Sequence, residues 1–431
     1  MYKLALTVIT VMSMATLTAC SLLDTTKPEI SATSTATFTP GTQSEVSNAQ
    51  FDTGEYKVTT TEIHQTDKHM ARYVESFVLG EYLPLPFEID GKLSETNGAL
   101  NILTPESLRL HFAREQIDVL EKNPPLYGFV NAAASRTEDA TTPPVALTHV
   151  VLRFNDPETA QKTAEAEHEL LIAKGLPTSE EGQAVPDTAM RIDGMRDSLI
   201  STGELAEHGT TYVTSLTPHQ EYVIYTWAQA PSDDAEQANN YVKKALEQQI
   251  PLLEQFPSVK TDAGYGKTDE FPSIDPGNVF TYAVPYLDDI MNTWAPGSFG
   301  PRGIAAQFSD SQVIYNSLVE NGVEHIGRQY SYVFRAKNKS GAKAVRETFI
   351  NSKLRHGGTE YDEPQGVPNT TCTATPFDSG TRYECYVLHE NYIGYIANDS
   401  QTEQGNDDQT KRMVSQKTAA QHLIFQQIQH Q

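Results

Sequence analysis

The chain has few basic residues and no long apolar run beyond its start. Its 32 Lys plus Arg stand against 56 Asp plus Glu, a formal net charge of −24. Phosphate backbones would be repelled at long range, so we expect no nucleic-acid partner. After residue 17 no segment is apolar over the roughly 20 residues that a spanning helix needs. The rest of the chain is therefore expected to be soluble and tethered only at its start.

The first 20 residues have the pattern of a bacterial lipoprotein signal. Lys3 precedes an apolar run of about 14 residues, which is too short to span a bilayer. The run ends in Leu17-Thr18-Ala19-Cys20, a lipobox. We expect residues 1–19 to be removed and Cys20 to receive diacylglycerol, which would anchor the extracytoplasmic protein to the outer leaflet of the cell membrane. The alternative is an ordinary signal peptide or an N-terminal membrane helix in which Cys20 is incidental.

The two remaining cysteines predict a disulfide. Cys372 and Cys385 form an even pair, and turn-forming residues such as Pro376 and Gly380 lie between them. In an oxidising compartment this pattern favours a disulfide across a hairpin over two free thiols. The pair lacks the close spacing of zinc ligands, so no metal is expected.

Length and composition divide the chain into parts. Residues 20–50 are rich in Ser, Thr, Ala and Pro with almost no large apolar side chains, which predicts a flexible tether behind the lipidated Cys. The remainder exceeds what one hydrophobic core usually organises. We assign residues 51–260 to a first α+β domain and residues 279–431 to a second. Residues 261–278, rich in Gly, Pro and Asp, would link them.

From residue 51 the chain passes twice through one order of elements. The first pass has helices at 68–79 and 106–121, a strand at 150–154, a helix from Asp156 to Gly175, strands at 212–216 and 221–228, and a helix opened by residues 232–234. The second has helices at 285–294 and 309–320, a strand at 330–334, a helix opening at Ser340, strands at 382–388 and 391–397, and a helix at 409–427. The fold class is therefore α+β: two tandem related domains, each an antiparallel sheet packed with helices. The alternative is a coincidence that any α+β chain could offer.

Several short segments carry a family resemblance. They are Phe51-Asp52-Thr53-Gly54-Glu55-Tyr56, Tyr127-Gly128-Phe129 ahead of 150–157, and Gly300-Pro301-Arg302-Gly303 followed by 330–341. Together they resemble an uncharacterised family of cell-envelope lipoproteins of high-GC Gram-positive bacteria, a domain of unknown function. The resemblance implies no catalytic residues and transfers only the lipidated Cys20. The second pass is also similar to extracytoplasmic sensor domains of membrane kinases, which implies ligand sensing or partner binding.

Two fragments imitate a phosphate loop and a nucleophile elbow. Gly266-Lys267-Thr268 ends like a phosphate-binding loop, but Thr261 stands where that loop needs Gly, so a solvated linker is expected. Ser298 lies in Pro296-Gly297-Ser298-Phe299-Gly300, where Pro replaces the first Gly of a nucleophile elbow.

Two further fragments lack partners elsewhere in the sequence. Ser340 and Lys343 have Ser-x-x-Lys spacing, yet the chain has no Lys-Thr-Gly, so Ser340 is expected to be a helix N-cap. Glu165 and His168 have the spacing of a di-iron ligand pair without a second motif, which predicts a charged solvent face.

We therefore expect a lipid-anchored, non-enzymatic envelope protein without a cofactor, which binds an unknown extracytoplasmic ligand or envelope protein. Its site is expected between the two halves, because pockets favour domain interfaces. One alternative is an envelope-acting hydrolase that uses Ser298 or a carboxylate pair. Another is a structural assembly partner of an envelope complex.

Overall fold

The protein was analysed as a computed structural model, which describes residues 51–63, 66, 68–136, 143–175, 184–205, 208–287, 297–377 and 379–428. Cys20, the tether and most of the predicted helix at 285–294 lie outside these ranges. Within them, no helix combines the length and the apolar character that crossing a membrane requires.

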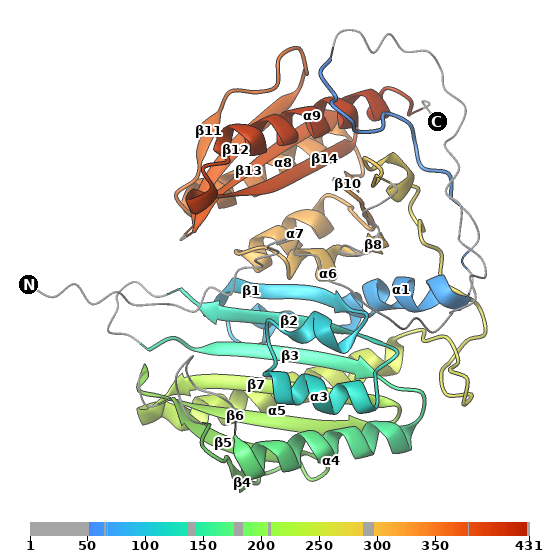
Figure 1. The fold of residues 1–431 in the computed structure, drawn as a ribbon. Helices are drawn as coiled ribbons and strands as arrows, with labels where there is room; N and C mark the ends of the chain where they lie inside the picture. The colour runs from blue at the N-terminus through green and yellow to red at the C-terminus, as the bar shows by residue number, and fades with distance from the viewer. Residues whose placement is uncertain are drawn as a thin grey trace, which may run out of the picture.

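The first half of the chain forms one antiparallel sheet with helices on both faces (Figure 1). In the described residues its seven strands have the order β1-β2-β3-β7-β6-β5-β4. The strands are β1 (Leu93–Ile102), β2 (Tyr127–Ser135), β3 (Ala146–Arg153), β4 (Thr188–Met190), β5 (Leu199–Leu205), β6 (Thr210–His219) and β7 (Tyr222–Pro231). The helices are α1 (Lys68–Leu79), α2 (Pro86–Ile89), α3 (Arg114–Lys122), α4 (Pro157–Lys174) and α5 (Ala235–Gln255).

The second half repeats this topology. Its described strands have the order β8-β9-β10-β14-β13-β12-β11, which matches the first sheet strand for strand. They are β8 (Gly297–Phe299), β9 (Ile326–Arg328), β10 (Tyr332–Arg335), β11 (Thr359–Tyr361), β12 (Thr370–Phe377), β13 (Gly380–His389) and β14 (Tyr392–Gln401). Its helices are α6 (Pro301–Ala305), α7 (Ser311–Glu320), α8 (Lys339–Arg355) and α9 (Asp407–Phe425). The predicted fold of two tandem antiparallel α+β domains is confirmed.

The hairpin between the two longest central strands is the same in both halves. β6 turns into β7 through Gln220, whose φ is 52°, and β13 turns into β14 through Glu390, whose φ is 48°. Side chains other than Gly seldom adopt this left-handed conformation. Its recurrence at both turns sets the same register in the two domains.

The helix that follows the third strand of each sheet is capped in the same way. Asp156 accepts a hydrogen bond from the N–H of Thr159 at the start of α4, at 2.8 Å. Asn338 accepts from the N–H of Gly341 at the start of α8, also at 2.8 Å. The predicted cap at Asp156 is thus confirmed, whereas Ser340 lies inside α8 and Asn338 takes the capping position.

Each sheet buries both faces. α4 covers one face of the first sheet over Leu216 and Val223, and α5 covers the other over Val213 and Ile224. In the second sheet α8 and α9 lie on opposite faces in the same manner. One apolar cluster continues from the α5 face, through Phe77 of α1, to the α8 face, so the two domains share a core.

One predicted helix is shorter than expected. Residues 106–121 divide into a 3-10 turn at Pro105–Leu108 and α3, which starts at Arg114. Ala113 has the extended conformation between them, and its N–H is bound by the side chain of Gln116 at 3.2 Å. This cap interrupts the helical pattern that the sequence suggests.

Candidate functional site

Ser298 does not stand at an exposed turn. It lies in β8, which pairs with β9, and the residue is 5% exposed. Its hydroxyl donates to the carbonyl oxygen of Ile274 at 2.7 Å. A nucleophile elbow presents its Ser on a strained turn with the hydroxyl free to react, and this geometry differs from it.

The segment that resembles a phosphate-binding loop, around Lys267, caps the end of a helix. Lys267 Nζ donates to the carbonyl oxygens of three residues at the end of α5: Leu253 at 2.9 Å, Glu254 at 2.6 Å and Phe256 at 2.9 Å. A cation at the C-terminus of a helix satisfies its free carbonyls and the negative end of its dipole. All three donors of this ammonium group are thereby used.

The Ser-x-x-Lys fragment does not form a catalytic pair. Ser340 donates to Asn338 Oδ1 at 2.7 Å, and Lys343 faces Glu347 one turn further along α8. Both interactions stabilise the first turns of the helix.

The Glu-x-x-His fragment is divided between surface and core. Glu165 is exposed and accepts from Gln161, while His168 is half-buried. Between them Glu167 is buried, which corrects the expected charged solvent face at that position. The described residues contain no group of three His, Cys, Asp or Glu side chains placed to hold a metal ion.

The contact between the domains is filled with side chains around α6. Glu81 accepts from the N–H groups of Arg302 at 3.1 Å and Gly303 at 2.6 Å. Burial raises the pKa of Glu81 to about 7. Arg302 also forms an ion pair with Glu88 at 2.5 Å. At these residues the predicted cleft between the halves is closed by polar contacts.

A groove lies instead at one end of the first sheet. It is formed by the β6–β7 turn, the end of α5 and the segment that follows α5. Its lining residues are His219, Gln220, Glu221, Tyr222, Leu253, Glu254, Ser258, Gly266 and Lys267. Lys267 is bound to the helix end and Glu221 to Arg153, so the more accessible polar side chains of the groove are His219, Gln220 and Glu254.

A buried charge cluster supports the floor of this groove. Arg153, at the end of β3, is 1% exposed. It donates to Glu75 of α1 at 3.3 Å and to Glu221 at 3.2 Å. It also donates to the hydroxyl of Tyr127 at 2.7 Å and to the carbonyl oxygen of Tyr265 at 3.0 Å. One guanidinium therefore holds α1, two strands and the segment after α5 together.

The electrostatics of the cluster follow from its burial. Burial raises the pKa of Glu75, although Arg153 opposes this effect. The N–H of Val259 donates to the same carboxylate at 2.7 Å. Burial likewise raises the pKa of Tyr222 to about 12. One guanidinium thus hydrogen-bonds to both buried carboxyl groups.

One weak sign of this cluster is visible in the sequence. Arg153 is a single cation inside the apolar run Val150-Val151-Leu152-Arg153-Phe154, and a buried charge needs a partner. Its partners are 78 and 68 residues away along the chain, so spacing alone cannot find them.

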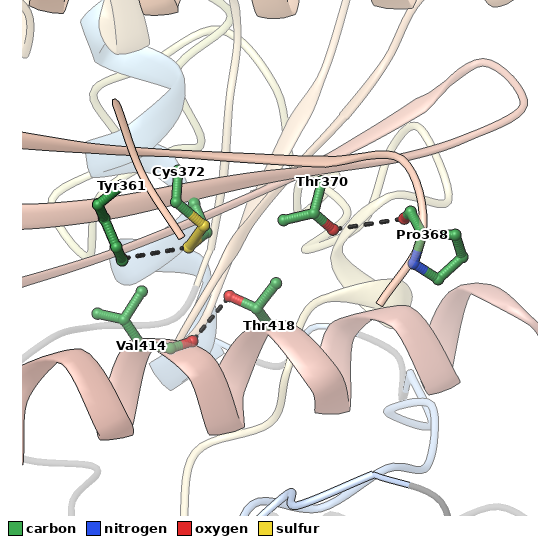
Figure 2. The surroundings of a disulfide bond; sticks show 7 residues. Tyr361, Pro368, Thr370, Cys372, Val414 and Thr418 are labelled. Atoms are coloured by element: carbon green, nitrogen blue, oxygen red, sulfur yellow. Dashed lines mark hydrogen bonds between the residues drawn. A yellow bond between two sulfur atoms is a disulfide. The ribbon is translucent and has the colours of Figure 1, made fainter. Parts of the chain in front are cut away.

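The predicted disulfide is present in the second domain. Cys372 of β12 and Cys385 of β13 are opposite each other in the ladder and are bonded. Figure 2 shows the bond between the sheet and α9, above Val414 and Thr418 of that helix. The hydroxyl of Tyr361 lies 3.4 Å from Cys385 Sγ. Both cysteines are buried, so the bond joins two strands inside the core.

Comparisons with known proteins identify the family but no activity. A model described as a domain of unknown function (DUF7373), N-terminal, matches residues 62–266, and its C-terminal counterpart matches 283–427. The chain belongs to the DUF7373 family. No curated protein matches this DUF7373 chain. Among solved structures, the extracellular domain of PknH from Mycobacterium tuberculosis is similar at 8% identity and a TM-score of 0.30, covering 45% of this chain and 100% of that one.

Proposed function

We propose that this DUF7373 protein is anchored outside the cell by lipid on Cys20 and binds a ligand or a partner protein of the cell envelope without catalysing a reaction. The observation that carries the location is the buried Cys372–Cys385 disulfide. Disulfides of this kind persist in oxidising compartments outside the cytosol. The lipobox at Leu17–Cys20 supports the same location independently.

The binding role is supported by the state of the candidate catalytic groups. The hydroxyl of Ser298 is bound to a backbone carbonyl, and Lys267 is bound to a helix end. The carboxylates of Glu75 and Glu221 are held by Arg153. Each group is engaged in the fold, whereas the groove at the β6–β7 turn offers polar atoms to a ligand.

The family resemblance supports the proposed cell type. The segments around Phe51 and Gly300 resemble lipoproteins of high-GC Gram-positive bacteria. We accordingly place the protein at the outer leaflet of that membrane.

Metabolic labelling with an alkyne fatty acid in such a host tests the anchor. The wild type should take up the label, partition with membranes and be digested by protease added to intact spheroplasts. The Cys20→Ser variant should lose the label, while a Cys372→Ser, Cys385→Ser double variant should keep it. An unlabelled wild type recovered from the cytosol would refute the location.

Crosslinking in intact cells, followed by mass spectrometry, tests the binding role. We expect crosslinks from residues near the groove, such as His219, to an envelope component. Turnover in broad esterase or glycosidase assays that Ser298→Ala abolishes would instead establish the hydrolase. Crosslinks confined to a large complex, spread over many surfaces, would establish an assembly partner.

A further inference from the structure

The segment before α1 belongs spatially to the second domain. We call residues 51–63 the strap. It precedes almost all of the region matched by the N-terminal family model, which starts at residue 62. Figure 1 shows this blue segment alongside α9 before it descends to α1. The strap therefore joins the predicted tether to the half of the molecule that is more distant in sequence.

The first part of the strap is bound along α9. The ring of Phe51 packs edge-on against the ring of His422, with the two ring centroids 5.5 Å apart. Asp52 accepts from Gln416 at 3.0 Å. Further along, Gln427 donates to the carbonyl oxygen of Val58 at 2.6 Å. These contacts fix the strap at three places along the length of the helix and just beyond it.

The last part of the strap is held by a reciprocal pair of backbone and side-chain bonds. The N–H of Thr61 donates to the carbonyl oxygen of Thr281 at 2.9 Å, and the Thr281 hydroxyl donates to the carbonyl oxygen of Thr61 at 2.6 Å. Gln329 donates to the Thr61 hydroxyl at 2.8 Å. All of these partners lie in the second half of the chain.

A buried lysine of α9 faces the middle of the strap. Lys417 of α9 is 6% exposed and places Nζ 5.4 Å from the ring centre of Tyr56 and 4.8 Å from that of Tyr330. It also donates to Asn398 at 2.6 Å. Burial lowers the pKa of Lys417 to about 8. Two aromatic faces and one amide thus hold a desolvated cation, a contact that ties Tyr56 to α9.

We propose that the strap is a clasp that fastens the membrane tether to α9, so that the second domain lies next to the membrane and the first domain points away from it. This inference rests on the proposed lipid anchor. Releasing the clasp would move the attachment point from α9 to α1. It would also add about 13 residues to the tether, which span roughly 43 Å when extended.

Energy transfer to labelled lipid measures this orientation. The mature lipoprotein would be reconstituted in phosphatidylcholine vesicles that carry an acceptor lipid. A donor dye would be attached at Gln409→Cys on α9 or at Glu169→Cys on α4, both exposed positions. We expect at least a twofold higher transfer efficiency from the α9 position.

Strap variants test the clasp itself. Lys417→Met should reduce the difference between the two positions and make the strap sensitive to protease. Tyr56→Ser, which leaves the α9 core intact, should do the same even if Lys417→Met fails to fold. Lys411→Met is the matched control, because Lys411 lies over Tyr383 rather than over the strap, and it should preserve the difference.

Three outcomes would overturn the inference, and they are distinguishable. Protein that floats with the vesicles but shows equal transfer from both positions refutes the orientation alone. Protein that does not float refutes the lipid anchor and this inference with it. A difference that persists in a variant whose strap has become sensitive to protease would also overturn the clasp.

Discussion

The two domains share one backbone plan and differ in where they bury charge. Arg153 ends β3 opposite Tyr222, and Arg335 ends β10 opposite Tyr392, so the two arginines occupy equivalent positions. Arg153 is buried between two glutamates, whereas Arg335 is half-buried and has no ion pair among the described residues. The residue after the shared turn differs as well: it is Glu221 in one domain and Asn391 in the other.

Two further buried acids, one in each domain, also differ in their partners. Glu167 of α4 is buried, and among the described residues it has no ion pair and hydrogen-bonds only with Gln116, at 3.3 Å. In the second domain the buried acid is on the sheet, where Glu384 pairs with Lys353 of α8 at 3.0 Å and accepts from Tyr395 at 2.6 Å. The turns and caps that set the topology are common to both domains, but the buried charges and their partners differ between them.

Removing the cation of the Arg153 cluster should have the largest effect. Arg153→Met leaves Glu75 and Glu221 buried without the cation that hydrogen-bonds to both, and breaking such a cluster costs about 3–5 kcal/mol of unfolding free energy. Arg335→Met at the equivalent position should cost less than about 1 kcal/mol. Urea unfolding of both variants measures the difference, and equal losses would mean that the two sites are energetically alike.

Loss of the disulfide should come next. A Cys372→Ser, Cys385→Ser double variant frees a loop of 12 intervening residues, which is expected to cost about 2–4 kcal/mol. The first domain has Ile200 opposite Ser215 at the equivalent place and should not respond to reductant. Hydrogen exchange with and without reductant checks this. Equal loss of protection in both sheets would show that the bond stabilises the whole molecule.

The two buried acids should respond differently to amide substitution. Burial raises the pKa of Glu167 to about 8, so this group favours folding below its unfolded pKa of roughly 4.3, and that contribution is lost as the pH rises towards 8. Glu167→Gln should therefore be neutral at pH 4 and stabilise the protein increasingly as the pH rises towards 8. Glu384→Gln removes the partner of Lys353 and should destabilise. Thermal unfolding across this pH range compares them, and stabilisation by both variants would contradict the contrast.

Glycine substitution at the left-handed residue of each hairpin turn should have the smallest effect. Gln220→Gly and Glu390→Gly remove side chains from a left-handed conformation and should each stabilise by roughly 0.5–1 kcal/mol. Because the turns are equivalent, the two gains should agree within error in chemical unfolding. A gain at one turn with a loss at the other would show that the hairpins are not equivalent.

Local signals predicted the parts of the fold that local interactions determine. The ends of α4 follow from Asp156 and Gly175, and α5 follows from the helical spacing of its apolar residues. β1 was not predicted, because its sequence Leu93-Ser-Glu-Thr-Asn-Gly-Ala-Leu-Asn-Ile102 has little strand propensity and its register against β2 is irregular. The strands β4 and β11 are too short to show alternation.

The candidate sites likewise differ in whether local sequence could predict them. The Cys372–Cys385 bond was predicted because two cysteines leave one pairing. The groove and the Arg153 cluster unite α1, two strand ends and the segment after α5, which are distant along the chain. The strap was missed for the same reason, since its partners on α9 lie hundreds of residues later: Asp52 and Gln416 are 364 residues apart.

A short strand forms one outer edge of each sheet, and this has a consequence for crowding. β4 and β11 each offer three residues at an outer edge. A neighbouring polypeptide that tried to extend either sheet would find few free backbone groups to pair with. Pairing of sheets from neighbouring molecules is therefore disfavoured at these two edges.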